Sequence, residues 1–288
     1  MENRDQEFRE SRLSIRGEVA VFTHANPGQR NALTQGLRLD YAEMIERVRS
    51  DDAVKALVLT GSGGSFCAGA DIRAMRDRFT GVTPERDAGD AARSRILQLQ
   101  DWLERLRGVE KPVIAAVDGP AFGAGFSIAL AADFIVASQT ATFSMVFNRL
   151  GVLPDMGAIH ILPRLIGLAK ARDLLMTARP IGAEEAVALG LVYEVCGPDA
   201  LLDTALDLAG RFAQAPQPAI GLTKRLLNRS FEVDYGTFVD LEGCAQSACA
   251  TSADHRDAVM RFLDREPARY DWDRLASKRA ALSGKEST

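Results

Sequence analysis

The sequence lacks several features that would each define a class of protein. Its four cysteines include no CxxC pair, which argues against both a zinc site and a disulfide framework. No HExxH motif occurs and the three histidines (His24, His160, His255) are dispersed, so we expect no metal site. Cysteine usage of this kind suits a reducing compartment, and we expect a cytoplasmic protein.

Long apolar runs and a strong charge of either sign are also missing. The most apolar stretch, residues 113–137, is interrupted by Asp118 and Asp133, which predicts buried core and not a membrane span. The first ten residues are charged and contain no apolar signal core. A net charge of −4 gives no reason to expect binding to nucleic acid or to an anionic membrane.

Common nucleotide-binding and hydrolase motifs are absent as well. Residues 61–66 lack the third glycine of a dinucleotide fingerprint, and no Walker A sequence occurs. Residues 125–129 do not form a nucleophile elbow, because the last position is alanine and not glycine. The chemistry of this chain must therefore depend on other groups.

Up to about residue 195, strand patterns alternate with helical ones. Residues 11–16 and 18–24 flank Gly17 and predict a β-hairpin, and Thr34 predicts the N-cap of a helix that runs to about Ser50. Further buried strands are predicted at residues 56–59, 112–117 and 134–137, with helices at 91–107 and 124–132. This alternation predicts an α/β fold built from stacked βα units.

From about residue 183 onward helical patterns dominate. They cover residues 183–189, 200–213, 219–228, 236–251 and 253–264. We therefore divide the chain into an α/β core, residues 1–195, and a C-terminal helical region, residues 196–288. Because a helical tail of this kind often packs against another subunit, we expect it to be an oligomerisation region.

Two turns of small residues follow neighbouring predicted strands. The first turn, residues 67–71, reads Cys-Ala-Gly-Ala-Asp, and the second turn, residues 121–125, reads Ala-Phe-Gly-Ala-Gly. Backbone N–H groups at the start of a helix lack an intrahelical partner, and small side chains let a ligand oxygen approach them. The pair predicts a site for a carbonyl oxygen; alternatively, both turns serve packing alone.

Four ordered motifs resemble those of the crotonase (enoyl-CoA hydratase/isomerase) superfamily over about residues 11–267. They are residues 60–72, residues 111–125 with Asp133 downstream, the early turn at 27–33, and residues 150–164. The resemblance implies an α/β fold in which a spiral of repeated ββα turns precedes a C-terminal helical region. It also implies a homotrimer or a dimer of trimers.

By this resemblance, the N–H groups of Ala70 and Ala124 hold the oxygen of an acyl-CoA thioester. Expected substrate and CoA contacts are Arg30, Ala32, Ala68, Asp71, Ile72, Gly123, Ser127, Phe147 and Lys224. Lys224 or its neighbour Arg225 would meet a CoA phosphate, although a solvated helix face explains them equally well. Asp71 is also expected to cap the helix that follows it. No permanently bound cofactor is implied, since CoA arrives as part of the substrate.

The residues facing the two turns bear on the reaction. Hydratases of this superfamily use two glutamates, but the corresponding positions hold Ser127 and Phe147. Asp155 instead resembles the proton-shuttling aspartate of isomerases of the phenylacetate-pathway type. An apolar wall should raise the pKa of Asp155, as such a shuttle requires. The alternative is that Asp155 merely caps a helix over residues 156–162.

The sequence therefore favours an enoyl-CoA isomerase that converts a 3-enoyl-CoA to a 2-enoyl-CoA through an enolate. A hydratase with a non-standard water site is the second hypothesis, and an acyl-CoA-binding protein with little catalysis is the third. A dehalogenase of the same superfamily would need a histidine where Gln100 stands. Asp133 is expected to be structural, and His160 is not expected to be catalytic.

Overall fold

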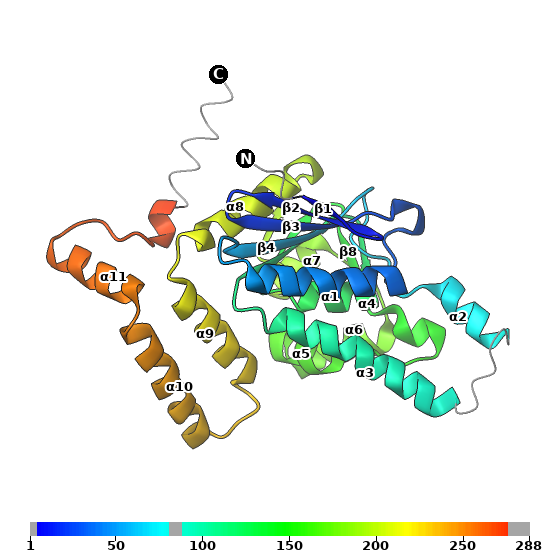
Figure 1. Ribbon diagram of the computed structural model, residues 1–288. Helices are drawn as coiled ribbons and strands as arrows, with labels where there is room; N and C mark the ends of the chain where they lie inside the picture. The colour runs from blue at the N-terminus through cyan, green and yellow to red at the C-terminus, as the bar shows by residue number, and fades with distance from the viewer. Residues whose placement is uncertain (1–4, 81–87, 276–288) are drawn as a thin grey trace.

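A seven-stranded sheet forms the centre of the computed structural model, which describes residues 5–80 and 88–275 (Figure 1). Its strands, in spatial order, are β1 (Gln6–Glu7), β2 (Ser11–Arg16), β3 (Val19–His24), β4 (Ala56–Gly61), β5 (Val113–Val117), β7 (Phe134–Ser138) and β10 (Glu194–Cys196). The predicted hairpin is confirmed, since β2 and β3 pair antiparallel with Arg16 opposite Val19. From β3 to β10 the pairs are parallel, so β4 and β5 end at the same edge of the sheet.

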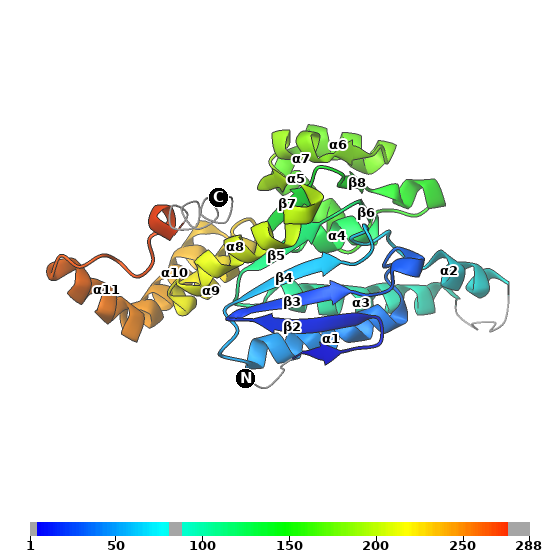
Figure 2. The same cartoon turned by 90° about the horizontal axis from the view of Figure 1, so that it is seen from above.

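Helices cover both faces of this sheet. Helix α1 (Gln35–Ser50) and helix α3 (Ala88–Arg107) lie on one face, and helix α8 (Leu201–Ala213) lies on the other (Figure 2). Side chains alternate accordingly along β4: Leu57 and Leu59 pack toward α1, whereas Ala56 and Val58 pack toward α8. The central strands β3, β4 and β5 are therefore buried on both sides, as their continuous apolar sequences predict.

Local sequence signals explain where α1 begins. The Thr34 hydroxyl accepts a hydrogen bond from Leu37 N at 3.1 Å, which confirms the predicted N-cap. The apolar face of α1 is buried, as its spacing predicts, at Leu37, Tyr41, Met44, Ile45 and Val48. The same face carries the fully buried Asp40, whose carboxylate accepts hydrogen bonds from Glu10 N and Ser11 Oγ.

A smaller layer of the fold includes the second turn. Strands β6 (Pro120–Phe122), β8 (Thr142–Ser144) and β9 (Ile181–Gly182) form a three-stranded sheet. The helices of this layer are α4 (Ala124–Leu130), α5 (Ala158–Ile166), α6 (Leu168–Thr177) and α7 (Ala183–Ala188), with the 3-10 turn η2 (Val146–Leu150). Together with the main sheet, these elements make the repeated turns of strands and helix that the resemblance implies.

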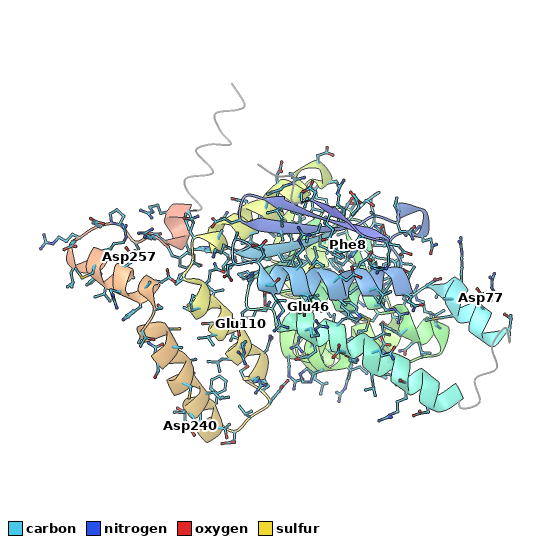
Figure 3. All side chains as sticks on the ribbon, viewed as in Figure 1. Phe8, Glu46, Asp77, Glu110, Asp240 and Asp257 are labelled. Carbon is cyan, nitrogen blue, oxygen red and sulfur yellow. The ribbon has the colours of Figure 1, made fainter. Side chains whose placement is uncertain are left out.

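Three helices follow α8 as an arm. Helix α9 (Gln217–Arg229) contacts the body through Lys224 and Asn228, whereas α10 (Tyr235–Ala250) and α11 (Ala253–Leu263) extend away from the sheet (Figure 1). Asp240 and Asp257 mark this arm in Figure 3, and Asp77 marks helix α2 (Ile72–Phe79) at the opposite side. None of the helices within the described ranges has both the length and the apolar character of a membrane span.

The predicted boundary at residue 195 falls before a helix that belongs to the body. Helix α8 buries Leu201, Ala205, Leu208 and Phe212 against β4, β5 and β7. Its amphipathic pattern resembles that of the arm helices in the sequence, and only the packing separates them. The arm proper begins after Ala213, with α9.

Candidate active site

The first turn is hydrogen-bonded to the early turn at residues 27–33. Ala68 N donates to Arg30 O at 3.0 Å, and Leu33 N donates to Gly69 O at 2.8 Å. Arg30 and Asn31 both adopt left-handed backbone conformations, which bend the early turn against residues 67–71. The structure thus brings together Arg30, Ala32, Ala68, Asp71 and Ile72, all of which the sequence assigned to CoA contacts.

The first turn is also joined to the second. Cys67 N donates to Pro120 O and Phe122 N donates to Cys67 O, each at 3.0 Å. These two bonds form a short parallel bridge between Cys67 and Ala121. Since β4 and β5 end at the same sheet edge, the chain segments that leave them continue side by side.

Two glycines permit this close approach. A Cβ on Gly125 would lie 2.1 Å from Cys67 O, so no side chain fits there. Gly69 has φ of +100°, and a Cβ on it would lie 2.7 Å from Phe122 O and 3.9 Å from Ala124 N. The residue before Ala70 therefore packs directly against the residues around Ala124.

The N–H groups of Ala70 and Ala124 are available to a ligand. Ala124 is the first residue of α4, and Ala70 forms an isolated bridge with Leu33. Within the described residues, neither N–H donates a hydrogen bond. Two unpaired N–H groups on adjoining turns can stabilise negative charge on one oxygen, because they are held in place before the charge develops.

Asp155 lies beside α4, in the segment that leads into α5. Its backbone oxygen is 3.3 Å from Ser127 Oγ, one helical turn beyond Ala124. Asp155 is half-buried, and this burial raises the pKa of its carboxyl group to about 6. At that pKa the carboxyl group can both accept and return a proton near neutral pH.

The helix-cap explanation of Asp155 is wrong. Helix α5 begins at Ala158, later than the predicted residue 156, and its N-cap is Gly157 without a side-chain hydrogen bond. Met156 and Gly157 take positive φ values of 52° and 74°, which turn the chain before the helix starts. The Asp155 carboxylate is therefore left for another role.

Ser127 and Phe147 lie against the second turn, as the sequence predicts. Ser127 is fully buried in α4, and its hydroxyl is 3.4 Å from Gly123 O as well as close to Asp155. The Phe147 ring lies 3.7 Å from the position that a Cβ on Gly123 would occupy. Neither side chain carries a charge, so neither supplies a base at this place.

Asp71 caps α2, as predicted. Its carboxylate accepts hydrogen bonds from Arg73 N at 3.0 Å and Ala74 N at 3.2 Å. Ile72, the first residue of α2, is 52% exposed beside the first turn. An exposed apolar residue at this place is free to contact a ligand.

Lys224 does not lie with the other predicted contacts, and its expected role at a CoA phosphate is corrected. It is only 7% exposed, and its Nζ donates to Asp133 Oδ2 at 2.7 Å and to Lys111 O at 3.1 Å. Both partners stand before β5 and β7, whereas the two turns follow the opposite ends of β4 and β5. Asp133 also accepts from Val113 N at 2.7 Å, which agrees with its expected structural role. Arg225 pairs with Glu110 on the exterior.

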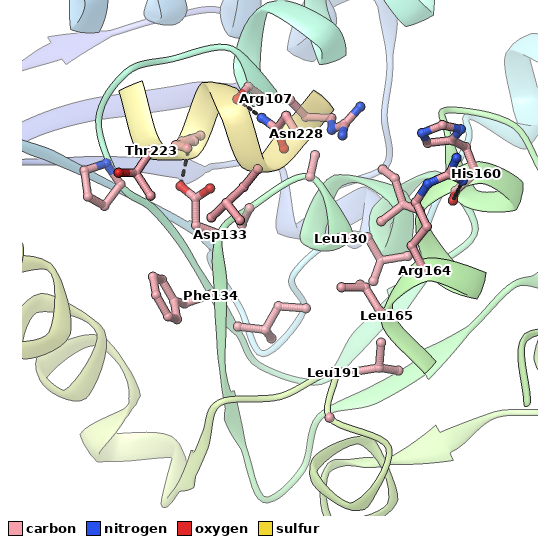
Figure 4. Close-up of a pocket in the computed structure, with 18 of the residues that line it drawn as sticks. Arg107, Leu130, Asp133, Phe134, His160, Arg164, Leu165, Leu191, Thr223 and Asn228 are labelled. Carbon is pink, nitrogen blue, oxygen red and sulfur yellow. Dashed lines mark hydrogen bonds and ion pairs between the residues drawn. The ribbon is translucent and has the colours of Figure 1, made fainter. Parts of the chain in front are cut away.

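A cavity of about 480 Å³ lies at that same end of the sheet (Figure 4). Its walls are mainly apolar and include Leu130, Phe134, Leu165 and Leu191. Two polar side chains on it have partners, since Asp133 pairs with Lys224 and His160 Nε2 lies 3.1 Å from Glu232 Oε1. The cavity includes neither turn nor Asp155, so the two turns and not this cavity define the candidate active site.

Sequence reasoning missed Asn31, which holds the early turn in place. Its side-chain amide donates to Ser62 O at 2.9 Å and to Ser65 O at 2.6 Å, and its Oδ1 accepts from Asn26 N. The residue is fully buried with φ of 55°. Asparagine tolerates this conformation better than most residues, but the sequence alone does not reveal the partners.

Comparisons with known proteins identify the family of this chain. A family model described as enoyl-CoA hydratase/isomerase matches residues 14–273. The chain therefore belongs to the enoyl-CoA hydratase/isomerase family and is an enzyme of the crotonase superfamily, which acts on CoA thioesters.

Relatives with different reactions are about equally similar. The chain is 35% identical to a 1,2-epoxyphenylacetyl-CoA isomerase of Escherichia coli, over 88% of this chain and 94% of that protein. It is also 35% identical to a short-chain-enoyl-CoA hydratase of Clostridium acetobutylicum, with the same coverage. A crystal structure of an enoyl-CoA hydratase/isomerase from Cupriavidus metallidurans superposes with a TM-score of 0.85 at 37% identity, over 92% of this chain and 97% of that chain.

Proposed function

We propose that this enzyme moves a carbon–carbon double bond, converting a 3-enoyl-CoA to the conjugated 2-enoyl-CoA. The observation that supports this most directly is Asp155, a half-buried carboxyl group beside α4 whose pKa burial raises to about 6. The positions where the resemblance expects two glutamates hold Ser127 and Phe147. A single carboxylate is sufficient for a double-bond shift, whereas paired acid–base addition of water uses two groups.

In the proposed reaction, the Asp155 carboxylate removes a proton from the α-carbon of the substrate. The electron pair of that C–H bond moves into the thioester carbonyl, and a dienolate forms. The N–H groups of Ala70 and Ala124 hold its oxygen, which makes a weak carboxylate base sufficient. The protonated Asp155 then returns the proton to the γ-carbon, so the double bond moves without loss or gain of atoms.

The early turn and the first turn supply the proposed CoA side of the site. Arg30, Ala32, Ala68, Asp71 and Ile72 gather there through backbone hydrogen bonds. Gly123, Ser127 and Phe147 form the proposed acyl side. No permanently bound cofactor enters this reaction, since CoA arrives and leaves with the acyl group.

Hydration is the second candidate, because hydratases are as similar to this chain as the isomerase is. In that reaction Ser127 would orient the water, although a serine hydroxyl is a weak base at neutral pH. Turnover of crotonyl-CoA at the rate of an ordinary hydratase would establish it and overturn the isomerase proposal.

Replacing Asp155 with asparagine tests the isomerase proposal. With trans-3-hexenoyl-CoA, Asp155→Asn should lose most isomerase activity, about 10²-fold or more, because the proton has no acceptor. Binding of the CoA ester should persist, since the N–H donors are unchanged. Full activity of the variant would refute the role of Asp155. Exchange of α-protons in deuterated water by the wild type separates an enzyme from a protein that merely binds acyl-CoA.

We also propose that the arm joins subunits into a homotrimer or a dimer of trimers in the cytoplasm. Large apolar side chains on the arm are exposed in the single chain: Leu227, Phe231, Tyr235, Phe262 and Leu263. Apolar surface of this kind is usually covered by a partner. Light scattering should give three or six times the mass of one chain, and a monomer would contradict the proposal.

A further inference from the structure

A buried chain of hydrogen bonds connects helix α1 to the first turn. His24, the last residue of β3, is fully buried, with its Nδ1 2.8 Å from Phe66 O. Its Nε2 lies 2.7 Å from the hydroxyl of Tyr41, which is fully buried on α1. Phe66 immediately precedes Cys67, where the first turn begins.

The partners determine which His24 nitrogen carries the proton. Phe66 O is a carbonyl and can only accept, so Nδ1 must donate. Nε2 of the neutral ring then accepts from the Tyr41 hydroxyl. Burial lowers the pKa of His24 to about 4, which keeps this arrangement intact at neutral pH.

Aromatic packing prevents the two rings from turning away. The Tyr41 ring stacks on Trp102 of α3 with a centroid distance of 4.6 Å. Phe22 contacts both rings edge-on, at 5.8 Å from His24 and 4.9 Å from Tyr41. The donor at Nδ1 is therefore held in one direction, toward the carbonyl of Phe66.

The Phe66–Cys67 peptide is the point where the two turns meet. Its carbonyl accepts from His24, and its N–H, on Cys67, donates to Pro120 O before the second turn. Rotation of this peptide would move the first turn against the second, and Ala70 follows three residues later. His24 is the side chain that fixes the carbonyl end of this peptide.

We propose that His24, oriented by Tyr41, is a positioning residue that aims the Ala70 N–H at the thioester oxygen. The inference rests on the proposed oxyanion site but not on which reaction follows. Without the Nδ1 donor, Phe66 O is left buried and unpaired, and the peptide rotates toward another donor. A small change in the direction of one oxyanion donor then lowers the stabilisation of the enolate, because such donors act through their geometry.

Three variants separate this role from simple core packing. His24→Leu removes the donor and keeps an apolar side chain. His24→Asn keeps a donor, since its Nδ2 has the same place along the side chain as the histidine Nδ1. Phe22→Leu disturbs the same aromatic cluster without touching any hydrogen bond to the first turn.

The readout is the ionisation of bound acetoacetyl-CoA, whose enolate absorbs in the ultraviolet. An oxyanion site lowers the pH at which this β-keto thioester ionises, whether or not the enzyme turns over an enoyl-CoA. We expect His24→Leu to raise that pH by about one unit, a tenfold loss of enolate stabilisation equal to about 1.4 kcal/mol. His24→Asn and Phe22→Leu should ionise the ligand as the wild type does, and kcat with trans-3-hexenoyl-CoA should follow the same order with little change in KM.

Either of two results with the variants would overturn the proposal. One is a wild-type ionisation pH in His24→Leu, and the other is an equal shift in Phe22→Leu, which would indicate packing alone. If the wild type does not lower the ionisation pH at all, the oxyanion site and this inference both fail. If the wild type lowers the pH but converts no 3-enoyl-CoA, only the proposed reaction fails.

Discussion

Replacing Asp155 with asparagine should make the protein more stable while it removes activity. Burial raises the pKa of Asp155 to about 6 in the folded chain, from an ordinary value of 3.8. The Asp155 carboxyl group therefore ionises at a lower pH in the unfolded chain than in the folded one. Between pH 3.8 and about 6 the unfolded chain has released this proton while the folded chain still holds it, and this favours unfolding. The folded protein loses stability as the pH rises through this window.

The magnitude follows from the two pKa values. A difference of about two units corresponds to about 3 kcal/mol above pH 7, as an upper bound, because Asp155 is only half-buried. The asparagine side chain is nearly isosteric with that of aspartate and carries no charge. Asp155→Asn should thus raise the free energy of unfolding by about 2 to 3 kcal/mol at pH 8, and by roughly half as much at pH 5.

Urea unfolding of both proteins at pH 8 and pH 5, at one protein concentration, measures this difference. The pH dependence of His24 and other groups is common to both proteins and cancels in the comparison. Asp133→Asn serves as a contrast, since that carboxylate is paired with Lys224 and its loss should destabilise the chain. The prediction would be refuted if Asp155→Asn had a lower free energy of unfolding than the wild type at pH 8. It would also be refuted if the substitution changed the free energy of unfolding by the same amount at pH 8 and pH 5.

Two further predictions concern the contact between the turns and the ion pair of Lys224 with Asp133. Gly69→Ala should lower turnover about tenfold or more, because its methyl group would lie 2.7 Å from Phe122 O, beside Ala124. The matched control in the enzyme assays is Gly210→Ala on α8, where a Cβ meets nothing within 4 Å. Lys224→Met should cost about 1.5 to 3 kcal/mol in urea unfolding, because Asp133 and Lys111 O both lose the buried ammonium group that donates to them. Titration calorimetry should find that Lys224→Met binds acyl-CoA with the affinity of the wild type. If the variant instead binds acyl-CoA more weakly while its stability is unchanged, Lys224 would contact CoA after all.

Local signals in the sequence were sufficient for most elements. Thr34 caps α1 and Asp71 caps α2, because a cap depends on residues only two or three positions away. Apolar spacing likewise predicts the buried face of α1 and the buried strand β4. The small residues of the two turns could be recognised for the same reason, since close backbone approach requires small side chains at particular positions.

The partners of single side chains could not be read in the same way. Lys224 meets Asp133, which lies 91 residues earlier, and helical spacing alone cannot distinguish a buried lysine from a solvated one. Asp155 precedes a helix and resembles a cap, but positive φ values at Met156 and Gly157 delay the helix start. In the sequence His24 is one of three dispersed histidines, and only the fold places it against Tyr41 and Phe66.

By itself, the sequence determined the alternation of strands and helices and the two small-residue turns. Those features are local, being set by capping, periodicity and side-chain size. The spiral arrangement of the fold was implied only by the resemblance to the crotonase superfamily. Only the tertiary structure decided that the turns touch, that Lys224 is buried at the other end of the sheet, and that α8 belongs to the body. Each of these depends on parallel pairing of distant strands, which short-range patterns do not specify.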